Sequence, residues 1–527
     1  MNCCHDVRCC KILIGINKVN YKVIGVAFEP WESELMLDVL ARIKDSGKDV
    51  NVAMIVADTF QMRYEKHKNT LEKNASEYGI KIFVLEEYFN KWNKKQKANE
   101  LNDRYILNNA KNYNIKSSTR VLMRSDHIFS CYERSPYYGQ VKEGKQYEIF
   151  NDILVWVKKV IENYKPDLIF TFGNNYLVKN IIYQISLAVN VRFLTLITAR
   201  LHGYYYFHDS FGVGVSNEIM SMLPNITDMD RENAYNFLCD VRSKQIDKKL
   251  YSGMTESRVN LLQKGKKEPI KYLLYESVQL MRAIINPIRY YMNGEKDIFN
   301  EVVYGSSLWR VQLFELRVFI NKIKYLILPL ENSINSVPDY PYILYPLHVR
   351  PESTTLTLGA GADDEEVIDF IDRRIPIGVK LLVKENPAMI GERKKSFYKY
   401  LKKKRNVVLV DPMVSTIDLV KNALGVVGIS GTMLLEAALE NIPVHALGWP
   451  EYREFLSSYG WDSLDEFMVC CSKKKGKKCR ESILSYIALV EKKKVQVDMG
   501  WEIVYSADIK KKSSLSISNM LMKEMGL

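Results

Sequence analysis

The 527-residue sequence contains no apolar run of about eighteen residues or more, which excludes an ordinary membrane-spanning helix. Its best candidate, residues 181–198, is interrupted by Gln184, Asn190 and Arg192, and predicts a buried helix followed by a strand. The first residues also lack the apolar segment and small-residue cleavage site of a signal peptide. We therefore predict a cytoplasmic protein, one that could also rest peripherally on the inner face of the cell membrane.

Cysteine occurs in a pattern that does not favour metal binding. Three adjacent pairs are present, and His5 lies between the first two: Cys3-Cys4, Cys9-Cys10 and Cys470-Cys471. A structural zinc site would need C-x-x-C spacing and a second matching half, and the sequence has neither. We expect reduced, unpaired thiols, no metal and no cofactor.

Acidic residues are fewer than basic ones, 62 against 75, which gives a formal net charge of +13. Much of the basic surplus lies in short runs at residues 402–405, 473–478 and 510–512. Such runs are most often solvated surface, but they also suit anionic lipid surfaces and polyanionic substrates. No helix-turn-helix, RNP-type or zinc-finger pattern accompanies them, so we expect no nucleic-acid partner.

The chain is too long for one hydrophobic core, and short apolar runs alternate with helix-like segments in both halves. This alternation predicts an α/β protein with parallel, doubly wound sheets. In the first half Ser33 is expected to cap the first helix. The strands of that half are predicted at residues 23–28, 50–56, 80–85, 166–173 and 191–197.

From residue 228 to residue 330 the pattern is helical, with breaks expected at residues 264–266 and 293–294. The second α/β half has strands predicted at residues 342–347, 379–384, 407–410, 425–429 and 444–447. The expected domains are 1–227, a helical insertion at 228–335, a second α/β domain at 336–470 and a lysine-rich helical tail at 471–527.

The segment Ser430-Gly431-Thr432 lies between a predicted buried strand and a predicted helix that carries Glu436. Backbone N–H groups at a helix start, the helix dipole and two hydroxyl groups together favour phosphate binding. A simple helix cap by Ser430 or Thr432 would fit the same residues. The apolar strand before the segment favours the phosphate site.

A second strand end carries Lys384-Glu385-Asn386-Pro387. A lysine there can neutralise a phosphate, and Asn386 can donate a hydrogen bond to one of its oxygens. The proline ends the strand and fixes the direction of the loop. An exposed turn with an incidental charge pair is the alternative.

At a third strand end His348, Arg350 and Glu352 are spaced two apart. Extended backbone places all three on one side, so that a histidine and a carboxylate could divide acid–base work beside a cation. A salt-bridged loop is the alternative. The acidic pair Asp363-Asp364 fits an ordinary helix start, so we expect no metal there.

In the first half Arg200 and Asp209 are candidate acceptor-side groups after a strand. The aromatic run between them, residues 204–207, could stack on a sugar or fill the core. Asp126-His127 is a further acidic candidate. Glu29 ends the first strand, where an open sheet exposes side chains to the cleft, and a carboxylate that only caps the turn is the alternative.

These motifs resemble a known family, the capsular polysaccharide synthesis and export-linked proteins that include bacterial β-Kdo glycosyltransferases. The resemblance rests on about a fifth of the chain. Its segments are P-L-H-V-R-P-E at residues 346–352, K-E-N-P at residues 384–387 with Gly391 and Arg393, and S-G-T at residues 430–432 with Glu436-Ala437.

The resemblance implies a metal-independent glycosyltransferase of the GT-B type, with two Rossmann-like domains facing a cleft. A nucleotide-sugar donor, of which CMP-Kdo is one example, would bind mainly the second domain, and a membrane-associated glycan or glycolipid acceptor would approach from the first. Two positions depart from the family pattern: Asn386 replaces a histidine and Arg350 replaces a glutamine. Both bear on which nucleotide sugar is bound.

Taken together, the sequence predicts a glycosyltransferase that builds a capsular or other cell-surface polysaccharide beside other assembly proteins. The expected catalytic residues are His348, Glu352, Arg200 and Asp209. The expected donor-binding residues are Arg350, Lys384, Glu385, Asn386, Pro387, Ser430, Gly431, Thr432 and Glu436. Polyol-phosphate transfer, nucleotide-sugar epimerisation and a non-catalytic role in glycan assembly remain as alternatives.

Overall fold

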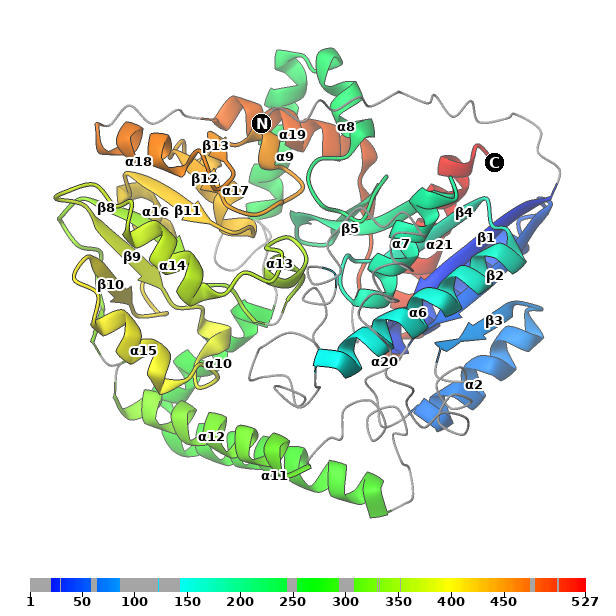
Figure 1. Ribbon diagram of the computed structural model, residues 1–527, viewed down its shortest axis with the longest axis horizontal. Coiled ribbons are helices and arrows are strands. Elements are labelled where there is room, and N and C mark those ends of the chain that lie inside the picture. The colour runs from blue at the N-terminus through cyan, green and yellow to red at the C-terminus, as the bar shows by residue number, and fades with distance from the viewer. Residues whose placement is uncertain are drawn as a thin grey trace.

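The computed structural model describes residues 20–28, 30–57, 64–85, 122, 143–243, 254–292, 308–328, 330, 332–350, 352–473, 479–499 and 502–527. Two lobes stand side by side, each built on its own seven-stranded sheet (Figure 1). The predictions made for Cys3-Cys4, His5, Cys9-Cys10, Glu29 and Asp126-His127 fall outside these residues.

The sheet of the first lobe has the order β14-β6-β5-β4-β1-β2-β3. The five adjacent strands β5, β4, β1, β2 and β3 are parallel to one another. Strand β6 pairs antiparallel with both β5 and β14. The strands are β1 (Tyr21–Ala27), β2 (Val50–Val56), β3 (Lys81–Val84), β4 (Leu168–Phe172), β5 (Arg192–Leu201), β6 (Tyr204–His208) and β14 (Val495–Gln496). The helices of this lobe are α1 (Pro30–Lys44), α2 (Tyr64–Glu77), α6 (Glu143–Tyr164) and α7 (Leu177–Ala188). Helices cover both faces, so β4 is apolar or threonine throughout and fully buried.

The sheet of the second lobe has the order β13-β12-β11-β8-β9-β10-β7, and all of its pairings are parallel. Its strands are β7 (Ser333–Ile334), β8 (Tyr342–Pro346), β9 (Lys380–Lys384), β10 (Val407–Val410), β11 (Gly425–Gly428), β12 (Val444–Ala446) and β13 (Ser458–Tyr459). Its helices are α13 (Ser353–Leu356), α14 (Asp364–Asp372), α15 (Lys395–Lys402), α16 (Thr416–Asn422), α17 (Thr432–Leu439) and α18 (Leu464–Ser472). The predicted doubly wound α/β class is confirmed in both lobes.

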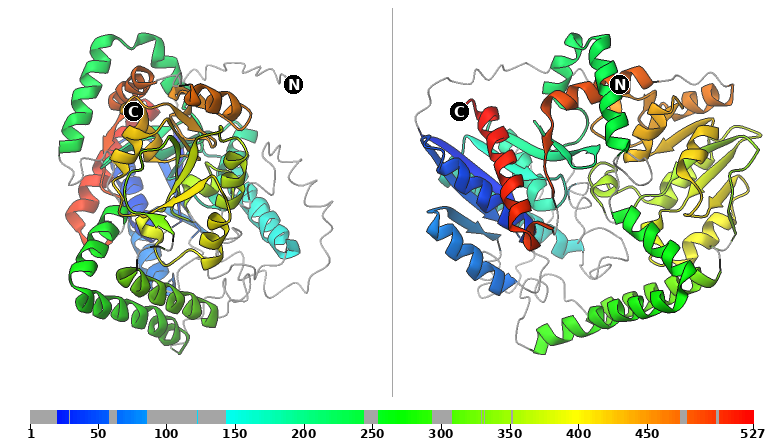
Figure 2. Two further views of the ribbon diagram at one scale, coloured as in Figure 1. Left: turned by 90° about the vertical axis from the view of Figure 1, so that its left-hand side faces the viewer. Right: turned by 180° about the vertical axis from the view of Figure 1, so that it is seen from behind.

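Further helices join and flank the lobes: α8 (Asn217–Met222), α9 (Asp228–Ser243), α10 (Met254–Lys267), α11 (Pro269–Met292), α12 (Leu308–Ile327), α19 (Arg480–Lys493), α20 (Glu502–Tyr505) and α21 (Ala507–Met525). The chain returns to the first lobe at its end, where α21 packs along α1 (Figure 2). Two Rossmann-like sheets with such a returning C-terminal segment form the predicted GT-B-like arrangement. In the described part of the chain, no helix has both the length and the apolarity needed to cross a membrane.

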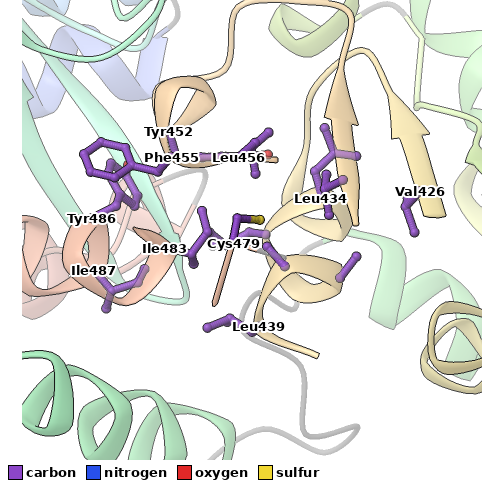
Figure 3. Packing of buried hydrophobic residues seen from close by; sticks show 14 of the residues in the cluster. Val426, Leu434, Leu439, Tyr452, Phe455, Leu456, Cys479, Ile483, Tyr486 and Ile487 are labelled. Carbon is purple, nitrogen blue, oxygen red and sulfur yellow. The ribbon is translucent and has the colours of Figure 1, made fainter. Parts of the chain in front are cut away.

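One hydrophobic core belongs to both lobes. Ile483, Tyr486 and Ile487 of α19 contribute to the same core as Leu434 and Leu439 of α17 in the second lobe (Figure 3). Residues of β5 and β6 in the first lobe, including Ile197 and Tyr206, belong to it as well. Because burying apolar surface is the main stabilising contribution, this shared core holds the lobes together.

Three local predictions were wrong. Helix α1 starts at Pro30, and Ser33 is a buried residue within it; the side chain of Glu32 instead accepts a hydrogen bond from the N–H of Phe28 at 2.7 Å. Helix α10 continues through residues 264–266 to Lys267. Gly265 does not break it; a Cβ there would lie only 2.7 Å from the ring of Tyr272, so the glycine permits close packing.

The third error concerns the strand before the aromatic run. Strand β5 continues to Leu201, so Arg200 lies within it, at a register shift and with a φ of 59°. The aromatic run then forms β6, whose Tyr206 and Phe207 are buried. Of the two interpretations of that run, core packing therefore holds for these two side chains.

A buried ion pair joins α1 to α7. The Nζ of Lys179 lies 2.8 Å from Oε1 of Glu32, and neither side chain is more than 3% exposed. Breaking a buried pair by removing one partner is costly, because the remaining charge loses its compensation.

We therefore expect Lys179→Met to lower the free energy of unfolding by about 3–5 kcal/mol, measured by urea unfolding with circular dichroism. Lys158→Met breaks the exposed pair with Glu162 on α6 and should cost less than about 1 kcal/mol. Equal losses in the two variants would contradict a special role for the buried pair.

Candidate functional site

The second sheet changes winding direction between β8 and β11. Strand β8 pairs with β9 on one side and with β11 on the other, and the segments that follow β8 and β11 leave from the same edge of the sheet. Open α/β sheets bind ligands outside the carboxyl ends of the strands at such a point. His348 follows β8 and Ser430 follows β11, so two sequence-predicted residues lie at this position.

The ring of His348 lies against the backbone of Ser430. Its Nε2 is 2.7 Å from the carbonyl oxygen of Ser430. Because a carbonyl can only accept, Nε2 carries the proton and donates, and Nδ1 presents a lone pair. That Nδ1 is buried and has no hydrogen-bond partner among the described residues. Burial lowers the pKa of His348, so the ring is neutral at pH 7.

Gly431 stands between this histidine and the start of α17. Its φ of 101° is a conformation that favours glycine, and an added Cβ would lie 3.6 Å from Nε2 of His348. The N–H groups of Thr432 and Met433 fall in the first helical turn, where no carbonyl four residues earlier in the helix can accept from them. They carry the positive end of the helix dipole. The segment can therefore bind an anion.

Two contacts fix the segment from outside. The hydroxyl of Tyr452 donates to the carbonyl of Gly431. Within α17, the carboxylate of Glu436 accepts a hydrogen bond from Arg242 of α9 at 2.6 Å. Glu436, which the sequence predicts as a donor-binding residue, is thus engaged with an arginine.

Beneath the loop after β8 lies a set of buried charges, here called the arginine cluster: Arg350, Arg393, Asp364 and Glu385. Arg393 donates to Asp364 at 2.6 Å, to Glu385 at 3.0 Å and to the carbonyl of His348 at 2.8 Å. Arg350 donates to Asp363 at 2.6 Å and to the carbonyl of Ala362. Burial alone would raise the pKa of Asp364, but Arg350 and Arg393 hold it below its ordinary value.

The predicted K-E-N-P segment is largely engaged in the lobe itself. The Nζ of Lys384 donates to the carbonyl of Pro412 at 2.9 Å. Glu385 belongs to the arginine cluster and also accepts from Tyr398 at 2.8 Å. The side-chain oxygen of Asn386 caps the 3₁₀ turn η3 (Pro387–Met389) by accepting from Ala388 at 3.0 Å.

The first lobe meets this region through Arg200. Its guanidinium forms a two-point contact with Glu451, at 2.6 and 3.3 Å, across the two lobes. The Thr357 hydroxyl donates to the carbonyl of Asn174 at 2.7 Å, and so ties the loop after α13 to the first lobe. Asp209 is part-exposed, and its Oδ1 is 3.5 Å from Nδ1 of His208.

The structure brings His348 together with the segment at residues 430–432. Glu385 is linked to the carbonyl of His348 through Arg393, whereas Arg350 and Lys384 contact Asp363 and the carbonyl of Pro412. Glu352 starts the turn of α13, with its carbonyl accepting from Thr355 and Leu356. The sequence reasoning missed Asp364 and Glu451 as partners of arginines. For Glu451, its place in the segment that follows β12 is a signal that the sequence offered, because groups after strand ends lie at the ligand-binding edge of such a sheet. The described residues contain no group of His, Cys, Asp and Glu suited to a metal ion.

No family model matches the chain, and no curated protein matches it. Matching solved structures include the UDP-GlcNAc 2-epimerase from Neisseria meningitidis bound to UDP-GlcNAc, at 14% identity over 95% of this chain and 100% of that one, with a TM-score of 0.20. They also include a beta Kdo 2,7 transferase, KpsC, from Thermosulfurimonas dismutans, at 11% identity over 70% and 89%, with a TM-score of 0.32. Likeness at this level carries no argument about function, which must come from the residues themselves.

The buried, neutral His348 makes stability depend on pH. In the unfolded chain the ring takes up a proton near its ordinary pKa of 6.5, whereas in the folded protein the pKa is lower. Stability is therefore full above about pH 6.5 and falls as the pH is lowered from there toward the folded pKa.

We expect His348→Gln to reduce the slope of unfolding free energy against pH in this window, measured by denaturant unfolding at a series of pH values. The slope is compared rather than the absolute stability, since losing the hydrogen bond to Ser430 lowers stability at every pH. An unchanged slope would contradict the neutral, buried state of the ring. His445, whose pKa burial lowers to about 4, contributes a slope of the same sign in both proteins.

Proposed function

We propose that the protein is a metal-independent glycosyltransferase that uses a nucleotide-sugar donor to build a capsular or other cell-surface glycan. The observation that carries this proposal lies at the switch point of the second sheet, where a helix start meets the buried ring of His348. Its Nε2 contacts the segment before the helix, and its Nδ1 has no hydrogen-bond partner among the residues that the structure describes. A buried polar atom without a partner calls for a physical reason, and a substrate group is one.

In this proposal the donor phosphates bind the N–H groups of Thr432 and Met433 and the Thr432 hydroxyl. Gly431 allows the phosphate oxygens to approach the backbone closely, since it has no Cβ. Tyr452 and His348 hold the two carbonyls of the segment, at Gly431 and Ser430, so that the N–H groups keep their direction.

The Nδ1 of His348 then serves as the general base. An acceptor hydroxyl attacks the anomeric carbon, the bond from that carbon to the donor phosphate breaks, and the hydroxyl proton passes to Nδ1. A neutral ring is the state that this step needs, and burial supplies it. Relative motion of the lobes admits the substrates and afterwards excludes water.

The acceptor, a glycan or glycolipid, approaches from the first lobe. Arg200 and Asp209 lie on that side. Burial is the main cause of the lowered pKa of His348, and the positive charge of Arg200 lowers that pKa further. The Arg200–Glu451 ion pair connects the acceptor side to the segment after β12. Glu352, in the turn that follows His348, is the second candidate for acid–base work.

Thr432→Ala should weaken binding of a nucleoside diphosphate by about tenfold, because one hydroxyl contact to a charged oxygen is lost. Isothermal titration with UDP, GDP, CMP and the corresponding nucleotide sugars measures the effect. Ser506→Ala removes a serine cap from α21 in the first lobe and is the matched control, expected to bind as the wild type does. Unchanged affinity in Thr432→Ala would refute the phosphate assignment, and no binding of any nucleotide would refute the enzyme itself.

His348→Gln should lower turnover by about a hundredfold or more while nucleotide affinity changes only a few-fold, as the loss of a general base predicts. Product analysis after incubation with a nucleotide sugar and a glycan acceptor measures this. Isomerised donor without transfer would identify an epimerase, and a transferred polyol phosphate would identify the other alternative; either result would replace the proposed reaction. Nucleotide binding without any turnover would instead support a non-catalytic assembly protein.

A further inference from the structure

Helices α11 and α12 lie together along one edge of the molecule, away from both sheets (Figure 1). Their inner sides are packed. Tyr272 of α11 and Tyr325 of α12 share a small core with Leu262 of α10, and the Nζ of Lys322 lies 2.9 Å from Glu276. This packing fixes which faces of the two helices remain outside.

The outer face of α11 is an apolar stripe. Its side chains recur at helical spacing, and Ile270, Leu274 and Met281 are 74%, 62% and 54% exposed. The same stripe includes Val278 and Ile285, which are also exposed. The outer face of a helix that contacts water usually carries polar side chains. A contiguous exposed apolar stripe instead marks a surface that contacts a partner.

Helix α12 carries a second exposed row. Its apolar members are Leu313, Leu316, Ile320 and Ile327, and Lys324 stands among them. Two neighbouring helices therefore both present large apolar side chains. Neither helix is long and apolar enough to cross a bilayer, which leaves contact along a surface rather than insertion through it.

The charge around these rows is basic. Residues 261–285 and 312–328 contain eight Lys and Arg residues against three Glu. Two of the eight face inward, since Lys322 pairs with Glu276 and Arg317 donates to the carbonyl of Glu392. Lys271 and Arg282 are exposed and border the α11 stripe on one side. Lys271 also pairs with Glu268 at 2.8 Å, but both side chains are exposed, and such a pair is weak enough to exchange for another anion. An apolar stripe bordered by basic residues complements an anionic lipid surface.

We propose that α11 and α12 form a docking surface for membranes that contain anionic lipid, lying flat with their apolar rows among the acyl chains. The +13 net charge of the chain attracts the protein to such a surface over a longer range. This inference does not depend on the donor chemistry, so it can hold or fail independently of the proposed function.

The test uses the full-length protein and sedimentation with vesicles of phosphatidylcholine, with or without phosphatidylglycerol. We expect binding to the anionic vesicles, at least tenfold weaker binding to the neutral ones, and loss of binding at high salt. Leu274→Glu with Met281→Glu should lower affinity for the anionic vesicles by about tenfold or more, since two apolar anchors are replaced by anions.

The matched control is Met229→Glu with Val469→Glu, two exposed apolar residues on α9 and α18. It introduces the same charge elsewhere and should keep most of the binding. Circular dichroism and the melting temperature should be unchanged in both variants, because all four sites are exposed. A second pair, Lys271→Gln with Arg282→Gln, should weaken binding roughly tenfold through charge alone.

Several results would overturn the proposal. Wild-type protein that ignores anionic vesicles, or binds neutral ones equally well, would do so. An equal loss of vesicle binding in the control pair would also do so, because it would show that the added negative charge, and not the position of the apolar residues, weakens binding. If sedimentation velocity shows a dimer that Leu274→Glu with Met281→Glu dissociates, while vesicle binding persists, the rows bind a second copy of the chain instead.

Discussion

The guanidinium of Arg393 connects three segments that are far apart in the sequence. It donates to the carbonyl of His348 after β8, to Asp364 at the start of α14 and to Glu385 at the end of β9. Two buried carboxylates would be unstable without this cation, so the three segments cannot separate without a large loss of free energy. The position of His348 follows from this constraint, because Arg393 fixes its carbonyl while Ser430 fixes its ring.

A second constraint joins the lobes. The core around α19 includes residues of β5 and β6 from the first lobe and of α17 from the second, and the pair Arg200–Glu451 lies beside it. The segment at residues 430–432 therefore rests on structure from both lobes. The register shift and the positive φ of Arg200 lie where the two lobes meet, because its side chain pairs with Glu451 of the second lobe.

The layers of the fold were accessible from the sequence because they depend on local pattern. A buried parallel strand such as β10 is a short apolar run between polar turns, and its bounds, Val407–Val410, were predicted without error. The position of Ser430 and His348 at strand ends was predictable for the same reason. Whether Lys384 faces a ligand or the carbonyl of Pro412 was not, since that contact joins residues 28 apart through tertiary packing. The same holds for Arg393 and Asp364, whose pairing no local pattern encodes.

The engagement of these cations changes how an anion can bind at the site. Lys384, Arg350, Arg393 and Arg200 all have carboxylate or carbonyl partners within the protein. Attraction for a phosphate must then come mainly from the backbone N–H groups and dipole at the start of α17, which is a fixed partial charge rather than a full one. In the proposed function, the donor phosphate would therefore be held mainly by the direction of these N–H groups rather than by a paired cation. The basic surplus that is not used there remains on the surface, where it can attract the protein to an anionic partner.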